Sequence, residues 1–179
     1  MVFVGAAAFF AILNWFAGER RSTTLEYVAK PATTALLLAA ALTITPDDPT
    51  MRAWFVAALA LCLAGDVFLM LPQDLFVPGL ASFLLGHIAF VVGLIQHGLD
   101  YPLPALAAVV LLPFIAKPVI DAVRRDHTEL LAPVSVYIVV IGLMLYAALA
   151  SGSVIGAAGG VMFVTSDRIL AHNRFIKPF

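Results

Sequence analysis

Two aspartates, Asp66 and Asp167, stand inside stretches that otherwise consist almost wholly of apolar residues. A carboxylate in the middle of a membrane-spanning helix is penalised by about 2.5–3.5 kcal/mol on insertion scales, so an acid in such a stretch indicates a functional site. Each aspartate follows a small residue, Gly65 or Ser166, and precedes a similar apolar pattern that ends in leucine. Two such acids in a chain of 179 residues suggest a chemical role, above all acid–base chemistry.

The composition predicts an integral membrane protein. The chain is 63% hydrophobic and 12% charged, whereas ordinary soluble domains are about half apolar and about a quarter charged. The net charge of −1 gives no indication of a nucleic-acid partner. The single cysteine, Cys62, excludes a disulfide framework within the chain.

Seven stretches approach or reach the length of a membrane span, which is about 17–25 apolar residues. Their approximate bounds are Val2–Ala17, Tyr27–Ile44, Arg52–Leu71, Val77–His97, Tyr101–Ala116, Leu131–Ala150 and Ser153–Leu170. The first is interpreted as a retained helix rather than a signal peptide, and the prolines of the fifth should kink or shorten it. No connection is long enough for a second domain. The predicted fold is therefore all-α, a polytopic transmembrane helical bundle in one domain, residues 1–179.

The basic residues predict the orientation of this bundle. Of the ten lysines and arginines, only Arg52 lies beside an even-numbered loop. The other nine lie in or beside the odd-numbered loops: Arg20, Arg21, Lys30, Lys117, Arg124, Arg125, Arg168, Arg174 and Lys177. Cytoplasmic loops are enriched in lysine and arginine, so the odd loops should be cytoplasmic and the N-terminus external.

This orientation places most of the polar residues that could take part in a reaction at a similar depth in the bundle. Asp66 and Asp167 lie near the cytoplasmic ends of their spans, and Lys30, His87 and Tyr137 lie in the same half of the bundle. We expect these five side chains to line one cavity open to the cytoplasm. If the acids converge there, one carboxyl would stay protonated beside an ionised one, the arrangement that acid–base hydrolysis needs.

Each of these residues also has a structural interpretation. Asp66 and Asp167 could each pair with a nearby lysine or arginine to fix helix packing, and Lys30 could extend its ammonium to the membrane surface. His87 has no histidine or cysteine three or four residues away, so a zinc site is poorly supported and a hydrogen-bonding role is easier to place.

The C-terminal basic residues have two interpretations as well. Asn173 and Arg174, with Arg168, could bind a substrate phosphate or anchor the protein to anionic lipid.

In combination these segments resemble the YhhN-like family, which includes the lysoplasmalogenases. The resemblance covers roughly residues 27–175 and depends on order and spacing, because no one motif is specific. The matching positions are Lys30-Pro31, Gly65-Asp66-Val67-Phe68-Leu69-Met70, Gly79, Phe83, Gly86-His87, Tyr137, Ser166-Asp167-Arg168-Ile169-Leu170-Ala171 and Asn173-Arg174-Phe175. Phe90 departs from the family, which often has a tyrosine there. The family usually has eight spans, so we expect either that an eighth helix is missing from this sequence or that one wall of the bundle is absent.

The resemblance implies an enzyme that hydrolyses the vinyl-ether bond of a lysoplasmalogen to a fatty aldehyde and a glycerophospho-ethanolamine or -choline. For this reaction we expect Asp66 and Asp167 as the catalytic residues, with Lys30, His87, Tyr137, Ser166, Asn173 and Arg174 binding the substrate. Neither a cofactor nor a metal is expected; the expected partners are the lysolipid and the bilayer, in the inner or plasma membrane. The native lipid, the oligomeric state and the division of acid and base roles stay open.

Three rival functions remain. A small transporter or proton-coupled carrier would also use buried acids, although little internal repetition is seen beyond the two aspartate motifs. A metal-dependent lipid hydrolase would need ligands that the scattered histidines do not supply, and a purely structural membrane protein would leave both acids unexplained.

Overall fold

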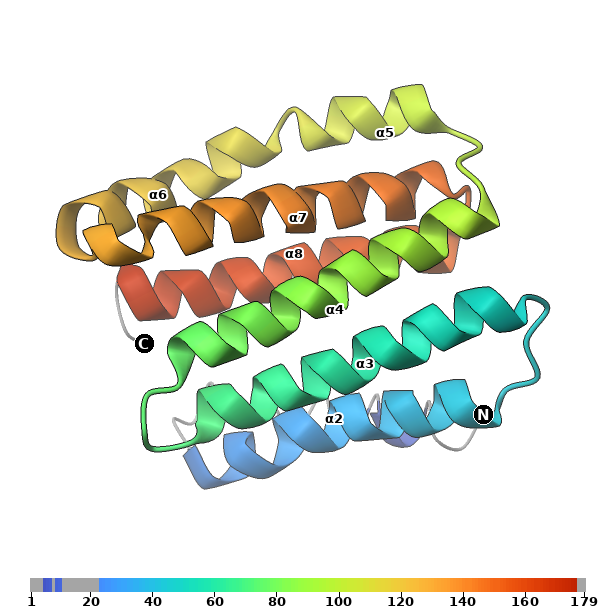
Figure 1. Ribbon diagram of the computed structural model, residues 1–179, viewed down its shortest axis with the longest axis horizontal. Helices are drawn as coiled ribbons and strands as arrows, with labels where there is room; N and C mark the ends of the chain where they lie inside the picture. The colour runs from blue at the N-terminus through green and yellow to red at the C-terminus, as the bar shows by residue number, and fades with distance from the viewer. Residues whose placement is uncertain (1–4, 8, 11–22, 177–179) are drawn as a thin grey trace. The chain divides into compact units, whose positions relative to one another are not determined.

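The computed structural model describes residues 5–7, 9–10 and 23–176, and these residues form α-helices joined by short connections (Figure 1). No β-strand occurs in that part of the chain, so the all-α prediction is confirmed. The helices are α2 (Thr23–Thr43), α3 (Pro49–Met70), α4 (Phe76–His97), α5 (Pro102–Val109), α6 (Leu112–Asp126), α7 (Leu131–Ala150) and α8 (Val154–Phe175), with a 3-10 turn at Thr128–Leu130.

The chain divides into two compact units, Met1–Gly93 and Leu94–Phe179. In the first unit α2 packs against α3, and α3 packs against α4. In the second unit α7 contacts α5, α6 and α8, and α6 also contacts α8. The single domain expected for residues 1–179 stays a prediction.

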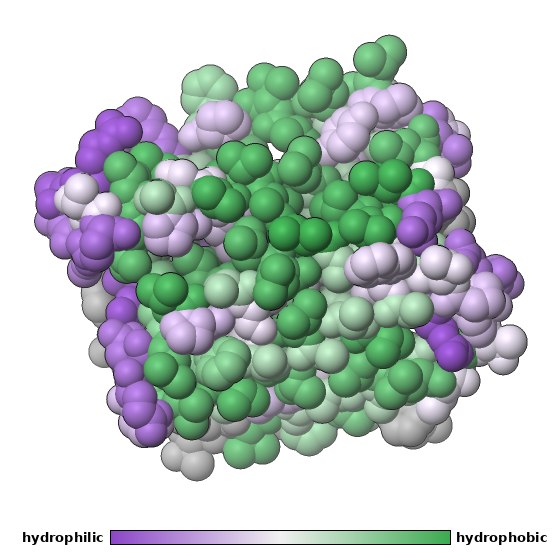
Figure 2. All heavy atoms as spheres, in the orientation of Figure 1, coloured by the Kyte–Doolittle hydropathy of each residue, from purple (hydrophilic) through white to green (hydrophobic). Residues whose placement is uncertain are grey.

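Four helical segments among the described residues are long and apolar enough to cross a membrane. They are α3, Phe76–Gln96 of α4, Thr128–Ala150 and α8. The apolar part of α2, Val28–Thr43, is shorter, and most of the predicted span Val2–Ala17 lies outside the described residues. In each unit, hydrophobic side chains cover much of the visible helix surface while hydrophilic residues gather at helix ends (Figure 2). The protein is a multi-pass helical membrane protein.

Glycines let α3 and α4 approach closely, and this contact fixes where Asp66 and His87 lie. Gly79, Gly86 and Gly93 follow one another at intervals of seven residues along α4. A Cβ added to them would lie 2.7 Å from Leu69, 2.9 Å from Cys62 and 3.0 Å from Phe55, respectively, on α3. A Cβ on Gly65 of α3 would in turn lie 2.7 Å from the Phe83 ring. A seven-residue repeat keeps one seam of two antiparallel helices in contact, and small residues shorten the distance between their axes.

The expected fifth span, Tyr101–Ala116, is interrupted. Helix α5 ends at Val109, and α6 begins at Leu112 with Pro113 in its first turn. Proline has no backbone N–H, so it cannot continue α5 but is well suited to start α6. The predicted effect of the prolines is confirmed at this position. Pro118, in contrast, is accommodated inside α6.

Helix α6 continues beyond the end of the predicted apolar stretch at Ala116 and ends at Asp126. The continuation is amphipathic: Val119, Ala122 and Val123 are buried, while Arg124 and Arg125 are exposed. A buried stripe at helical spacing stabilises the helix through packing, in spite of the charges on its other face.

Helix α8 likewise continues beyond the last predicted apolar stretch, from Leu170 to Phe175. Phe175 is buried, and its ring contacts the His127 ring with centroids 5.6 Å apart. This contact holds the last turn of α8 against the connection that follows α6. Arg168, Asn173 and Arg174 therefore all lie on α8.

The α3–α4 seam predicts that Gly86→Ala lowers stability. The new Cβ would lie 3.1 Å from the Ala58 carbonyl oxygen, a backbone atom of α3, as well as near Cys62 Sγ. Overpacking of this kind costs about 1–3 kcal/mol, and we expect a lower midpoint of thermal unfolding in detergent. Gly159→Ala is the matched control, because a Cβ added there would have no atom within 4 Å beyond its chain neighbours and the backbone of its own helix. Equal midpoints for the two variants would contradict the close seam.

Candidate active site

Asp66 is buried on α3 and is held by two side chains of α2. Its exposed fraction is 4%. Thr34 Oγ1 donates a hydrogen bond of 2.7 Å to Asp66 Oδ2, and Lys30 Nζ lies 3.6 Å from Asp66 Oδ1. Each carboxylate oxygen therefore faces a different group, a neutral hydroxyl or a cation.

The spacing of Lys30 and Thr34 explains why α2 presents both of them to Asp66. Residues four apart lie on the same face of an α-helix, and α2 is helical across both positions although Pro31 lies between them. The Lys30 side chain is 24% exposed, so the ammonium is only partly withdrawn from the surface. Its charge offsets part of the penalty for burying the Asp66 carboxylate.

This ion pair agrees with both interpretations of Asp66. A structural pair that fixes the packing of α2 on α3 would have the same geometry as a catalytic acid with a neutralising cation. The Thr34 hydrogen bond is the additional observation, since Thr34 was not among the site residues predicted from the sequence. In the sequence, Thr34 is marked only by its position four residues after Lys30. Thr33 is equally polar and lies three residues after Lys30, so the helical spacing alone does not show which threonine faces Asp66.

His87 is fully buried on α4, one residue after Gly86 of the seam. Its Nδ1 lies 2.6 Å from the carbonyl oxygen of Phe83. A carbonyl only accepts hydrogen bonds, so the proton must be on Nδ1, and the Nε2 of a neutral ring is then an acceptor. Among the described residues no group of three or more His, Cys, Asp or Glu side chains could hold a metal ion. The geometry of His87 is that of a hydrogen-bonding residue.

Asp167 is held in a similar way within the second unit. Tyr137 Oη on α7 donates a hydrogen bond of 2.5 Å to Asp167 Oδ2 on α8. Both side chains are half-buried. Tyr137 was predicted from the sequence to be near the aspartates, and the structure gives it a direct contact with Asp167.

The remaining predicted site residues lie on α8 on either side of Asp167. Ser166 and Arg174 are exposed, and Asn173 is half-buried. Asn173 Oδ1 is buried and has no hydrogen-bond partner among the described residues. A buried acceptor of this kind can bind a donor group of a ligand.

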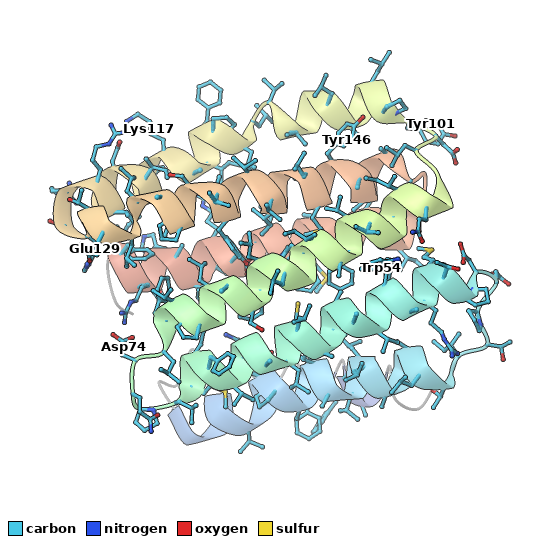
Figure 3. The ribbon with its side chains drawn as sticks, in the orientation of Figure 1. Trp54, Asp74, Tyr101, Lys117, Glu129 and Tyr146 are labelled. Atoms are coloured by element: carbon cyan, nitrogen blue, oxygen red, sulfur yellow. The ribbon has the colours of Figure 1, made fainter. Side chains whose placement is uncertain are left out.

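The C-terminal turn of α8 lies at the same end of its unit as the basic turn of α6, as the His127–Phe175 contact shows. Lys117 and Glu129 lie at this end, and Tyr101 lies at the other end of the unit (Figure 3). The basic last turns of α6 and α8 therefore lie at one end of the second unit.

The polar contacts of the two acids form two clusters, Lys30–Thr34–Asp66 in the first unit and Tyr137–Asp167 in the second. In both, an acid inside an apolar helix accepts a hydrogen bond from a hydroxyl on the neighbouring helix. Because the clusters belong to different units, one cavity shared by both acids stays a prediction.

These features define a class: multi-pass helical membrane proteins with hydroxyl-bonded acids inside their helices. Within it, the chain belongs to the YhhN family, whose sequence profile matches residues 25–179. Proteins named "Lysoplasmalogenase" from Mycobacterium bovis and Mycobacterium tuberculosis are each 34% identical to it over 153 residues, 81% of this chain and 58% of theirs. The human "Lysoplasmalogenase TMEM86B" is 30% identical over 124 residues, 68% of this chain and 51% of the human protein. The chain thus spans between half and three-fifths of these relatives' lengths. No solved structure matches it.

The Lys30–Asp66 pair predicts a non-additive effect on stability. Lys30→Met should lower the midpoint of thermal unfolding, because a buried carboxylate is left without its cation. Asp66→Asn in the same chain should restore part of the loss, since no charge then remains to be neutralised. Measured midpoints for both single variants and the double variant give the coupling. Strictly additive shifts would show that the two groups do not interact in solution.

Proposed function

We propose that this protein is a membrane-embedded hydrolase of the lysoplasmalogenase type. Its substrate would be a lysoplasmalogen, cleaved at the vinyl-ether bond to a fatty aldehyde and glycerophospho-ethanolamine or -choline. The observation that carries the proposal is the pair of aspartates inside apolar helices, each hydrogen-bonded to a hydroxyl of the next helix. The similarity to proteins named lysoplasmalogenase supports this choice of reaction.

Two carboxyl groups can supply every proton transfer of this hydrolysis. A protonated carboxyl gives its proton to the vinyl-ether carbon remote from the oxygen, which leaves an oxocarbenium ion. The second, ionised carboxylate accepts a proton from the water that attacks this ion, and a hemiacetal forms. In its collapse the first group takes back the hemiacetal hydroxyl proton, and the second gives its proton to the departing glycerol oxygen. Both groups then have their original protonation states, with no cofactor or metal ion required.

In this proposal Asp66 and Asp167 are the catalytic residues. Lys30 neutralises Asp66, and Tyr137 holds Asp167 in place through their hydrogen bond. The buried Asn173 Oδ1 accepts a hydrogen bond from the head group, and Arg174 binds its phosphate. His87 and Ser166 complete the substrate-binding residues, while the alkenyl chain lies among apolar helices.

The proposed location is the inner or plasma membrane, with the N-terminus outside and the reacting groups open to the cytoplasm. The proposal is supported by the nine-to-one distribution of basic residues in the sequence, and by the position of the basic last turns of α6 and α8 at one end of the second unit. The partners are then the lysolipid substrate and the surrounding bilayer.

Asp66→Asn and Asp167→Asn should each abolish turnover and leave a folded protein in detergent. Asparagine keeps the size and some hydrogen bonding of aspartate, but it cannot exchange the catalytic proton. The assay is aldehyde release from an alkenyl lysolipid, compared with the ester-linked analogue. Full activity in either variant would remove that aspartate from the mechanism.

Asp121→Asn is the matched control for this assay. Asp121 is an exposed acid on α6, and the hydrogen bond from Lys117 lowers the pKa of its carboxyl. The variant therefore removes a charged carboxylate, at a position far in sequence from Asp66 and Asp167. Its turnover should equal that of the unmodified protein. Chelators should leave turnover unchanged; loss on chelation with recovery on adding zinc would favour a metal hydrolase.

The proposed orientation predicts that residues 124–126 are accessible from the cytoplasm. Single cysteines placed there should react with a membrane-impermeant maleimide only after the membrane is opened. Cys62 is buried within α3 and should contribute little background, which a Cys62→Ala parent chain can verify. Labelling of positions 124–126 in intact cells would reverse the orientation.

A further inference from the structure

We propose that Thr34 is a positioning residue for Asp66: its hydroxyl fixes the plane of the Asp66 carboxyl so that the other oxygen, Oδ1, is the one that exchanges protons. This inference rests on the proposed function and adds a residue that lies outside the predicted site. It begins from the hydrogen bond of 2.7 Å between Thr34 Oγ1 and Asp66 Oδ2.

The Thr34 hydroxyl has one proton and two acceptors nearby. One is Asp66 Oδ2 at 2.7 Å, and the other is the Lys30 carbonyl oxygen at 3.5 Å, one turn earlier on α2. Hydrogen bonds between a hydroxyl donor and an oxygen acceptor usually have donor–acceptor distances of about 2.5–3.0 Å, so the proton points at the carboxyl. Threonine in a helix is restricted at χ1 to rotamers that keep its hydroxyl near the preceding turn. The donor is therefore held in place before it contacts Asp66.

Lys30 does not provide the same restraint. Its Nζ lies 3.6 Å from Asp66 Oδ1, which is beyond hydrogen-bond length, and its side chain is 24% exposed. An ammonium on a flexible stem acts mainly as a point charge and does not define the plane of a carboxyl group. The last torsion of aspartate is broad, so without a directed donor this plane would be poorly fixed.

The two oxygens of Asp66 are thereby distinguished. Oδ2 accepts from Thr34, while Oδ1 faces the cation without a hydrogen bond. Proton transfer depends on the orientation of the reacting oxygen, and a small misplacement of a reacting group lowers the rate by roughly tenfold to a hundredfold. Loss of the Thr34 hydroxyl should therefore lower kcat and leave KM nearly unchanged, because substrate contacts are retained.

The neighbouring threonine provides a control on the same helix. Thr33 Oγ1 donates to the Ala29 carbonyl oxygen of its own helix at 2.8 Å. Both threonines are half-buried. Thr33→Val and Thr34→Val thus remove the same group from adjacent positions, but only the second change removes a hydrogen bond to Asp66.

The experiment measures kcat and KM for the full chain and for Thr34→Val, Thr34→Ser and Thr33→Val on an alkenyl lysolipid. Thr34→Val should lose roughly tenfold to a hundredfold in kcat with KM within about twofold. Thr34→Ser keeps a hydroxyl and should retain at least half of kcat, and Thr33→Val should match the unmodified chain. Equal kcat for the two valine variants, or a loss in Thr34→Ser as large as in Thr34→Val, would overturn the proposal.

A second readout separates this inference from the proposed function. Dicyclohexylcarbodiimide reacts with carboxyl groups in apolar surroundings, and mass spectrometry follows its addition to Asp66. Removal of the Thr34 hydrogen bond should free Oδ2 and accelerate the addition several-fold relative to Thr33→Val. If the unmodified chain shows no lysolipid turnover, the proposed function fails, while faster labelling still supports the positioning of Asp66 by Thr34. Labelling at or below the rate of Thr33→Val would overturn the proposal whatever the turnover.

Discussion

The need to stabilise a carboxylate away from water is the constraint on which the site of this protein depends. Hydrocarbon offers no hydrogen bonds, so an acid there must obtain them from the protein. Both candidate acids obtain one from a hydroxyl on the adjacent helix, Thr34 for Asp66 and Tyr137 for Asp167. A hydroxyl is well suited to this purpose, because it donates to the carboxylate without adding a charge that must itself be compensated. The Lys30 cation adds a second, less directed contribution at Asp66.

Such hydrogen bonds require helices that are held in register, and in the first unit the small residues of α3 and α4 provide this. Gly65, which precedes Asp66 in the sequence, lies against the Phe83 ring. Gly86, which precedes His87, lies against Cys62. The contact that brings the helices together is thus adjacent in sequence to the polar residues. Phe90, where the family often has tyrosine, packs edge-to-face on Phe55 in the same seam with ring centroids 5.1 Å apart. This packing contact needs no hydroxyl.

The sequence predicts the long apolar helices well, because their length and composition are local properties. The predicted span Leu131–Ala150 coincides with α7, and those corresponding to α3 and α4 differ from the structure by at most three residues at each end. It predicts less well where packing outweighs local charge. Helix α6 continues beyond Ala116 because Val119 and Val123 are buried, and α8 continues beyond Leu170 because Phe175 is buried. Thr34 could not be chosen over Thr33 from the sequence, since their difference depends on which side of α2 faces α3.

The order of these donors and acceptors along the chain has a consequence for biogenesis. Thr34 precedes Asp66 by 32 residues, and Tyr137 precedes Asp167 by 30. In a chain that enters the membrane from its N-terminus during synthesis, each donor helix emerges before the helix that contains the acid. The helix with the hydroxyl is then already in the bilayer when the helix with the carboxyl is inserted. Each acid can therefore form its hydrogen bond on insertion, without a period in lipid before its donor has been translated.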